Sequence, residues 1–177
     1  MTGGAEYGRA LFLLAKEISL TDKIKEDLTV CLRAFDEHPE YKKMLDTPAI
    51  SKEEKLALAG EALAPLHECV VNLVKILSER HSVSLLGDVY DAYVALYNEE
   101  HGIEEVEAVS AIAMTVAQLD ALKQKLEAIT GKTVIIKNTV DGSILGGVKL
   151  RYEGKQIDAS VRTRLDGFAA GLRNIVI

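Results

Sequence analysis

Gly131-Lys132-Thr133 has the residue types that end a phosphate-binding loop, and this is the clearest chemical motif in the sequence. The complete loop needs a glycine five residues before Gly131, and this chain has Leu126 there. It also needs a strand before the glycines and a helix after the lysine. The local pattern predicts the reverse order, a helix followed by a strand. We therefore expect no nucleotide site at this position.

A hydrolase-like pairing of Asp158 with Ser160 is the second candidate for chemistry. A catalytic triad also needs a histidine, and every histidine lies in the first part of the chain. They are His38, His67, His81 and His101. None stands at metal-ligand spacing from another His, Cys or carboxylate. Asp158 is instead typical of a residue that caps the start of a helix. The sequence thus predicts no catalytic site, no metal and no other cofactor.

The composition disfavours several other classes of function. Cys31 and Cys69 lie on apolar helical stripes without CxxC spacing, which favours two reduced core thiols. The net charge of -6, with no long Lys/Arg cluster, disfavours nucleic-acid binding. No apolar run approaches the roughly 20 residues of a membrane span, and the first residues show no targeting signal. We expect a bacterial cytoplasmic protein without direct membrane insertion.

Six short helices are predicted in the first hundred residues, because apolar side chains recur there at helical spacing. The first predicted helix runs from about residue 4 to residue 18, and the sixth from about Val83 to Glu100. Between them, the second helix begins at Thr21, the third at Pro39 and the fourth at Ser51, and Pro65 lies near the first turn of the fifth. Ser51-x-x-Glu54 is a capping box. Short helices with short connections indicate an α-helical bundle.

The first predicted helix is apolar on nearly every side. Its apolar residues are Tyr7, Ala10, Leu11, Phe12, Leu13, Leu14 and Ile18. Such a helix needs more than one neighbour, so it is either central to the bundle or offers a face to a partner. On the fifth helix, Ile76 lies about 100° from Leu77 and off the core stripe. Ile76 is then either an ordinary surface residue or one edge of a groove for a partner helix.

After Gly102 the pattern changes to a period of two, which predicts a strand from Val106 to Met114 covered on both faces. A helix follows behind the capping box Thr115-x-x-Gln118 and closes at Gly131. Residues 132–138 and 143–151 are predicted to form a hairpin across Asp141-Gly142. A turn at 153–155 and a last helix capped by Asp158 complete the chain. The fold class is α+β: a six-helix bundle at 1–104 and a small β-α-β-β-α domain at 105–177.

Two adjacent glycines, Gly146 and Gly147, fall inside the second strand of that predicted hairpin. Glycine in a strand costs about 0.5–1 kcal/mol relative to alanine. Either a β-bulge bends the hairpin over its helices, or another chain comes close to the backbone there. The residues alone leave both interpretations open.

The same region resembles the signature of a known family. The matching residues are Val134, Ile136, Val140-Asp141, Ile144, Gly146-Gly147-Val148, Leu150-Arg151, Asp158-x-Ser160 and Leu165. They are similar to the pattern of the delta subunit of bacterial F-type ATP synthases, a family that includes the mitochondrial oligomycin-sensitivity-conferring protein. Length and the helical first half also fit. The resemblance therefore covers the whole chain.

This resemblance implies a non-catalytic stator subunit, peripheral at the cytoplasmic face of the bacterial membrane. In the family, a groove between the first and fifth helices takes the N-terminal helix of an alpha subunit. The positions implied for that groove are Tyr7, Ala10, Leu14, Asn72, Lys75 and Ile76. The second domain is implied to hold the C-terminal ends of the b-subunit stalk. Its family signature hairpin comprises Asp141, Gly146, Gly147, Asp158 and Ser160. The family often has an aromatic residue near the groove where this chain has Ile24.

Two other hypotheses remain at this point. One is a free-standing helical adaptor, which would share the groove without needing the two glycines. The other is a small enzyme with its site between the domains. That enzyme would need a strongly perturbed acid or base near Glu104–Glu107, where the sequence suggests a solvated linker.

Overall fold

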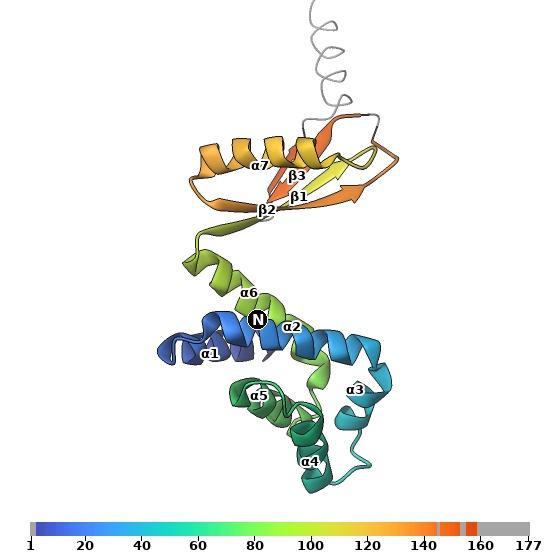
Figure 1. The fold of residues 1–177 in the computed structure, drawn as a ribbon. Coiled ribbons are helices and arrows are strands. Elements are labelled where there is room, and N and C mark those ends of the chain that lie inside the picture. Colours follow the sequence, from blue (N-terminus) through green and yellow to red (C-terminus); the bar gives the residue numbers. More distant parts are fainter. Residues whose placement is uncertain (1–2, 145, 153–154, 159–177) are drawn as a thin grey trace, which may run out of the picture. The chain divides into compact units, whose positions relative to one another are not determined.

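A computed structural model describes residues 3–144, 146–152 and 155–158 of the chain. The chain forms two compact units, Met1–Glu100 and His101–Ile177 (Figure 1). The break falls a few residues before the expected division at 104/105, because the first strand already begins at Ile103. Helices α1 to α6 lie in the first unit, whereas α7 and every described strand lie in the second, so the predicted α+β fold class is confirmed.

Six α-helices and one short 3-10 helix build the described part of the first unit. They are α1 (Gly3–Glu17), α2 (Thr21–Glu37), α3 (Pro39–Asp46), α4 (Lys52–Ala62), α5 (Glu68–Glu79), η1 (Val83–Leu85) and α6 (Leu86–Glu100). The stretch predicted as one helix from residue 83 to 100 therefore opens with a 3-10 turn. The Asp46 carboxylate accepts hydrogen bonds from the backbone N–H groups of Val83 at 2.7 Å and Ser84 at 3.2 Å. These bonds fix where the turn begins.

Capping explains one correct helix start and one wrong one. At α4, the Ser51 hydroxyl accepts the Glu54 N–H at 3.3 Å and the Glu54 carboxylate accepts the Ser51 N–H at 3.3 Å, as predicted. Pro65 was predicted to lie near the first turn of the fifth helix and Leu66 inside it, but α5 begins only at Glu68, so this helix start is wrong. His67 caps α5 instead: its Nδ1 accepts the Cys69 N–H at 3.3 Å.

The core of the first unit is built from apolar side chains of all its helices. Those with an exposed fraction below 2% include Ile24, Leu28, Cys31, Leu45, Val70, Val74, Leu77, Val83, Leu86, Val89 and Tyr93. The rings of Phe12 and Tyr93 meet edge to face with centroids 5.4 Å apart, which joins α1 to α6. Burial raises the pKa of the Cys31 thiol to about 12. Cys31 is thus a core thiol, while Cys69 is half-buried.

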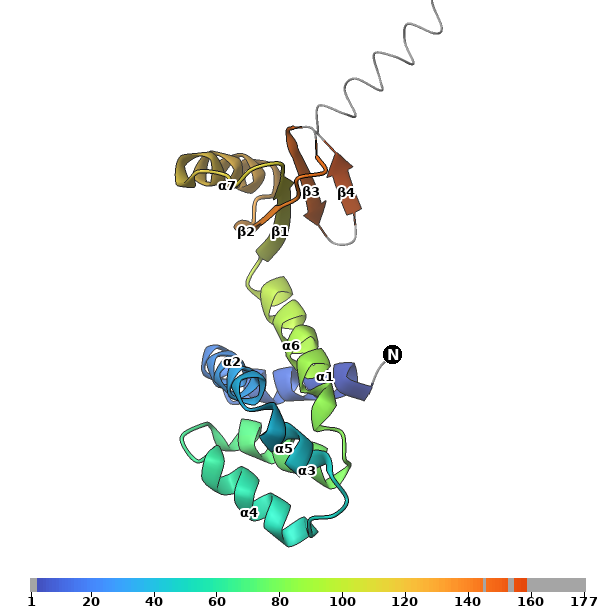
Figure 2. The same cartoon turned by 90° about the vertical axis from the view of Figure 1, so that its right-hand side faces the viewer.

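The second unit contains a four-stranded sheet with one described helix. Its elements are β1 (Ile103–Ser110), α7 (Val116–Thr130), β2 (Thr133–Val140), β3 (Val148–Tyr152) and β4 (Lys155–Asp158). The strand order is β2-β1-β3-β4, as Figure 2 shows. β1 pairs with β2 in parallel, and the β1–β3 and β3–β4 pairs are antiparallel. The capping box of Thr115 and Gln118 forms as predicted, and Gly131 ends α7 with φ 68°.

The predicted hairpin of residues 132–138 with 143–151 is wrong. β1 lies between β2 and β3, so these two strands do not pair. The Asp141-Gly142 turn ends β2, and the chain then passes to the other side of β1. The helical connection α7 makes this possible, because a parallel β1–β2 pair requires a crossover rather than a tight turn. β3 pairs instead with the next strand, β4, on its outer side.

α7 covers one face of the sheet; that β1 is covered on both faces stays a prediction, because the last predicted helix lies outside the described residues. Glu104, Val106 and Ala108 of β1 point to the α7 face and are buried. On the opposite face, Lys137 pairs with the exposed Glu105 at 2.7 Å. That face therefore carries charged pairs near the start of β1, whereas Val109 on the same face is only 4% exposed.

Candidate partner-binding surface

Helix α1 presents two different faces. Its buried face consists of Gly4, Gly8, Leu11, Phe12 and Ala15. A Cβ atom on Gly8 would lie 2.5 Å from the Val89 carbonyl oxygen of α6 and 2.8 Å from the Ala92 Cβ atom. The two helices thus approach too closely for any side chain at this position. This contact fixes which side of α1 remains open.

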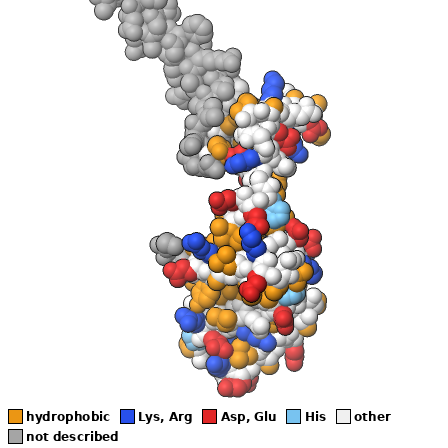
Figure 3. Space-filling model, turned by 90° about the vertical axis from the view of Figure 1, so that its left-hand side faces the viewer, with side chains coloured by type: hydrophobic (Ala, Val, Ile, Leu, Met, Phe, Trp, Pro, Cys, Tyr) orange, Lys and Arg blue, Asp and Glu red, His pale blue; other side chains and the backbone are white. Residues whose placement is uncertain are grey.

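The other side of α1 carries large apolar residues that the first unit leaves exposed. Leu13, Leu14 and Ile18 keep exposed fractions of 57%, 43% and 40%. Ala10 is exposed beside them and Tyr7 is half-buried. Figure 3 shows hydrophobic side chains, in orange, gathered among charged ones on one face of the first unit. An apolar face with this helical spacing is typical of a surface that binds another helix.

Helix α5 lies next to α1 and offers a second apolar edge. Its side chains Val70, Leu73, Val74 and Leu77 are buried. Ile76 is 44% exposed and Asn72, one turn earlier, is exposed as well, while Lys75 is half-buried. The off-stripe position predicted for Ile76 is therefore the one it occupies.

A hollow of about 740 Å³ brings part of the predicted set together. It is lined by Gly3, Glu6, Tyr7, Ala10, Arg80, Ser82 and Leu85. The Arg80 N–H donates to the Ile76 carbonyl at 3.2 Å, so Ile76 lies one helical turn beyond this hollow on α5. Leu14, Asn72 and Lys75 do not line it. Arg80 was missed from the sequence, although its spacing of four residues from Ile76 places both on one helical face.

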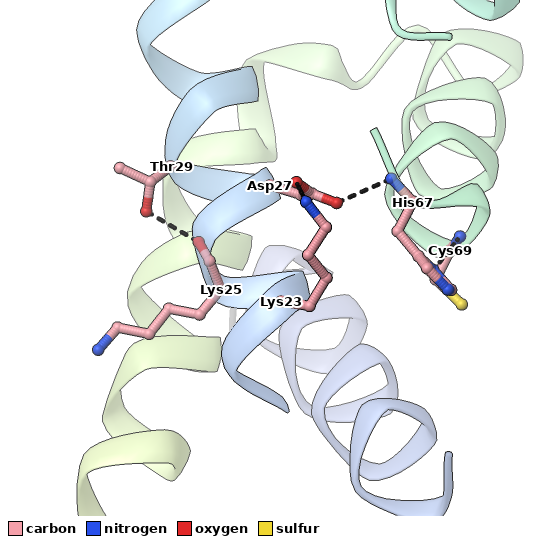
Figure 4. A network of polar contacts seen from close by, with 6 residues as sticks. All are labelled: Lys23, Lys25, Asp27, Thr29, His67 and Cys69. Atoms are coloured by element: carbon pink, nitrogen blue, oxygen red, sulfur yellow. Dashed lines mark hydrogen bonds and ion pairs between the residues drawn. The ribbon is translucent and has the colours of Figure 1, made fainter. Parts of the chain in front are cut away.

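A buried carboxylate holds α5 in place beside α2. Asp27 is only 3% exposed, and its Oδ2 accepts the His67 N–H at 2.8 Å. Its Oδ1 accepts from Lys23 Nζ at 2.9 Å, as Figure 4 shows. His67 in turn caps α5 through Cys69. Because a charge-assisted bond between two helices is specific in geometry, Asp27 sets the start of α5 and hence the position of its open face.

Two tyrosines of α6 anchor the start of α2. The Tyr93 hydroxyl donates to the Thr21 carbonyl at 2.9 Å, and the Tyr97 hydroxyl donates to the Asp22 carboxylate. The bond to Asp22, together with burial, raises the pKa of Tyr97. Ile24 is fully buried nearby in the chain. Ile24 therefore belongs to the core, and the position matched to the family aromatic does not form an edge of the open surface.

The acidic residues at the start of β1 do not converge on a site. Glu105 pairs with Lys137, and Glu107 accepts from the Thr139 hydroxyl at 2.9 Å. Glu104 points to the opposite face, is 4% exposed, and neither of its oxygens has a hydrogen-bond partner among the described residues. The described part of the chain contains no group of three His, Cys, Asp or Glu side chains that could hold a metal ion. None of the described helices is long and apolar enough to cross a membrane.

The two signature glycines precede β3 rather than lying inside a strand, which corrects the prediction. Gly146 has φ 150° and Gly147 has φ 85°, which favour glycine. A hollow of about 650 Å³ adjoins them, and α7 forms one of its walls. Its lining includes Ser110, Met114, Ala121, Leu122, Gly146, Gly147 and Val148. The Asp141 carboxylate accepts the Ser143 N–H at 2.9 Å, and hydrogen bonds from Ser143 lower the pKa of Asp141.

Asp158 is the last residue of β4, where its backbone lies opposite Lys149. The helix it was predicted to cap, and Ser160, lie outside the described residues.

Comparison with known proteins decides the family. A family model described as ATP synthase delta (OSCP) subunit matches residues 4–172. The chain belongs to this family. Proteins named ATP synthase subunit delta are similar along nearly their whole length: that of Geobacillus sp. (strain WCH70) is 33% identical, with 90% of each chain covered. That of Clostridioides difficile (strain 630) is also 33% identical, with 96% of this chain and 95% of the relative covered.

The delta (OSCP) fold is also found in a solved complex. A chain in the cryo-EM structure of the Toxoplasma gondii mitochondrial ATP synthase hexamer superimposes with a TM-score of 0.76 at 25% identity. The match covers 97% of this chain and 98% of that one. The family predicted from the signature residues is therefore confirmed.

Proposed function

We propose that this chain is the stator subunit of an F-type ATP synthase and that it ties the catalytic head to the peripheral stalk through two surfaces. The open face of α1 and α5 takes the N-terminal helix of an alpha subunit. The second unit holds the C-terminal ends of the b subunits. As part of that complex the chain is peripheral, at the cytoplasmic face of the bacterial membrane. Family membership carries this proposal.

The exposed apolar residues allow the free energy gained by binding at the first surface to be estimated. Fully burying a Leu or Ile side chain contributes about 1.5–3 kcal/mol. Leu13, Leu14 and Ile76 are roughly half exposed, so each adds about 1 kcal/mol when covered. With Ile18 and equal contributions from the partner helix, the gain is about 8 kcal/mol before the cost of association.

That gain corresponds to micromolar binding at best, whereas nanomolar attachment needs about 12 kcal/mol. A stator must not release the head while the rotor turns. Attachment at two surfaces of one chain solves this, because the second contact forms at a high effective concentration. The division into two units suits this role.

Calorimetric titration of the full chain with a synthetic alpha-subunit N-terminal peptide from the same genome tests the first surface. Ile76→Asp should weaken binding by about 50-fold or more, because it buries an unpaired charge. Val30→Asp on α2 is the matched control, since Val30 is 42% exposed and does not line the hollow. Equal affinities for the two variants would remove Ile76 from the surface.

A substitution at the signature glycines tests the second surface. Gly146→Val should abolish binding of the b-subunit stalk and leave the alpha peptide bound, because valine is strained at φ 150° and protrudes into the hollow beside α7. The adaptor hypothesis expects no such selective loss. Pull-down of the two partners in parallel separates these outcomes.

A further inference from the structure

The hollow of about 740 Å³ at the N-terminal end of α1 carries one charge of each sign. Glu6 of α1 and Arg80, which directly follows α5, both line it, and both are exposed. The hollow thus combines a carboxylate from one helix with a guanidinium from the other. The rest of its lining is uncharged: Gly3, Tyr7, Ala10, Ser82 and Leu85.

Neither of these two charges is neutralised within the described part of the chain. No ion pair joins Glu6 to Arg80, although both line the same hollow. Among the described residues, neither side chain has another hydrogen bond or ion pair. The neighbouring Glu79 does not neutralise Arg80 either, because it pairs with Lys52 at 3.1 Å. Glu6 and Arg80 are therefore available to charged groups of a binding partner.

We propose that these two charges select the helix that binds the open face of α1 and α5 and set its direction. The inference rests on the proposed function. A fitting alpha-subunit helix carries, at one end of its apolar stripe, an acidic side chain that meets Arg80 and a basic one that meets Glu6. A helix with charges of one sign at that end would be attracted by one residue and repelled by the other. Such complementary charges mainly provide specificity, while the apolar residues provide affinity.

The direction follows because the hollow lies at one end of the open face only. The exposed Leu14 and Ile18 lie toward the other end of α1. From Glu6 to Leu14 the helix rises about 12 Å, so the partner needs about two turns of apolar stripe beyond its charged pair. A partner bound in the opposite direction would carry that pair to the far end of α1. There Lys16 already pairs with Glu100 at 2.9 Å.

Calorimetric titration of the full chain with the synthetic alpha-subunit N-terminal peptide tests Arg80 against a matched control. Arg80→Glu should weaken binding about tenfold, because repulsion replaces attraction at the acidic residue of the peptide. Arg80→Gln, which only removes the charge, should weaken binding about threefold. Arg33→Glu on α2 changes the net charge by the same amount, and Arg33 is exposed and does not line the hollow. This control should bind the peptide as the unmodified chain does.

A set of peptides in which each acidic residue in turn is replaced by lysine identifies the residue that meets Arg80. One of them should bind Arg80→Glu about as tightly as the original peptide binds the unmodified chain. The same peptide should bind the unmodified chain about tenfold more weakly, which is the coupling that a double-mutant cycle detects. Glu6→Lys, titrated with peptides in which each basic residue is replaced by glutamate, identifies the second contact in the same way.

The two peptide residues found in this way should lie within about one helical turn of each other, at one end of the apolar stripe. Restoration by residues at opposite ends of the peptide, or by none, would overturn the inference. Equal affinities of Arg80→Glu and Arg33→Glu would overturn it too. In these cases binding of the alpha-subunit helix to the open face stands. Absence of binding between the original peptide and the unmodified chain would overturn the proposed function as well.

Discussion

Replacing Gly8 by alanine should destabilise the first unit by about 2 kcal/mol, although alanine is the better helix former. The new Cβ would lie 2.5 Å from the Val89 carbonyl oxygen and 2.8 Å from the Ala92 Cβ. Ordinary non-bonded contacts are about 3.5 Å, so α1 must move about 1 Å away from α6. Overpacking costs about 1–3 kcal/mol, and the upper end applies because a backbone carbonyl cannot rotate aside. Helix propensity returns about 1 kcal/mol.

The matched control is Gly87→Ala, because a Cβ on Gly87 of α6 would meet nothing within 4 Å. That variant should gain about 1 kcal/mol from helix propensity alone. Chemical denaturation can be followed by tyrosine fluorescence, since the chain has no Trp and five of its six Tyr precede residue 101. If Gly8→Ala is as stable as Gly87→Ala, the helices are not in the close contact described, and the argument for which face of α1 is open fails with it.

Three further substitutions or modifications probe the interior. Asp27→Ala should cost about 2–3 kcal/mol, because it leaves the His67–Lys23 side of the bundle without its acceptor, whereas the exposed Asp36→Ala should stay within about 0.5 kcal/mol in the same denaturation assay. Burial raises the pKa of Cys31 to about 12, so its thiol stays protonated at pH 8. We therefore expect iodoacetamide to label Cys31 only after the chain is unfolded. Rapid labelling of Cys31 in the native chain, seen by mass spectrometry, would contradict this. Glu104→Leu should raise stability by up to about 1 kcal/mol, because removing a buried carboxylate without a hydrogen-bond partner outweighs the loss of its ion pair with Lys132 at 4.0 Å; a loss of stability would show that the carboxylate has a favourable role.

Local signals in the sequence predicted the helices because their causes lie within a few residues. Ser51 and Thr115 each form their capping box, and Gly131 adopts the left-handed conformation that ends α7. The predicted start of α5 was wrong because the cause of the actual start is not local. Its cap, His67, is held by Asp27 from another helix, and histidine is not among the usual capping residues.

Strand pairing was wrong because its cause is not local. Ile103 pairs with Thr133, and Glu107 pairs with Arg151. Nothing near the Asp141-Gly142 turn reveals that β1 will lie between the strands on either side of it. Asp141-Gly142 was correctly predicted to end a strand, but the residues of a turn do not determine which strand the following one pairs with.

The candidate surface was predictable in part. The over-apolar first helix and the off-stripe Ile76 indicated an open face, and both are exposed in the structure. Arg80 was not predicted, because its place beside Tyr7 depends on how α5 lies against α1. Ile24 shows that a resemblance can also mislead. It occupies the position where the family often has an aromatic residue near the groove, but here it is fully buried.

The strand order also determines when the sheet can form during synthesis of the chain. β1 occupies the middle of the sheet, yet both of its neighbours are encoded after it, the second ending at Tyr152. The first unit is complete once Glu100 has been made. At about 5–20 residues per second, a ribosome needs several more seconds to supply the remaining strands. A nascent chain therefore has a finished helical bundle, with its apolar face ready, before the sheet can form at all.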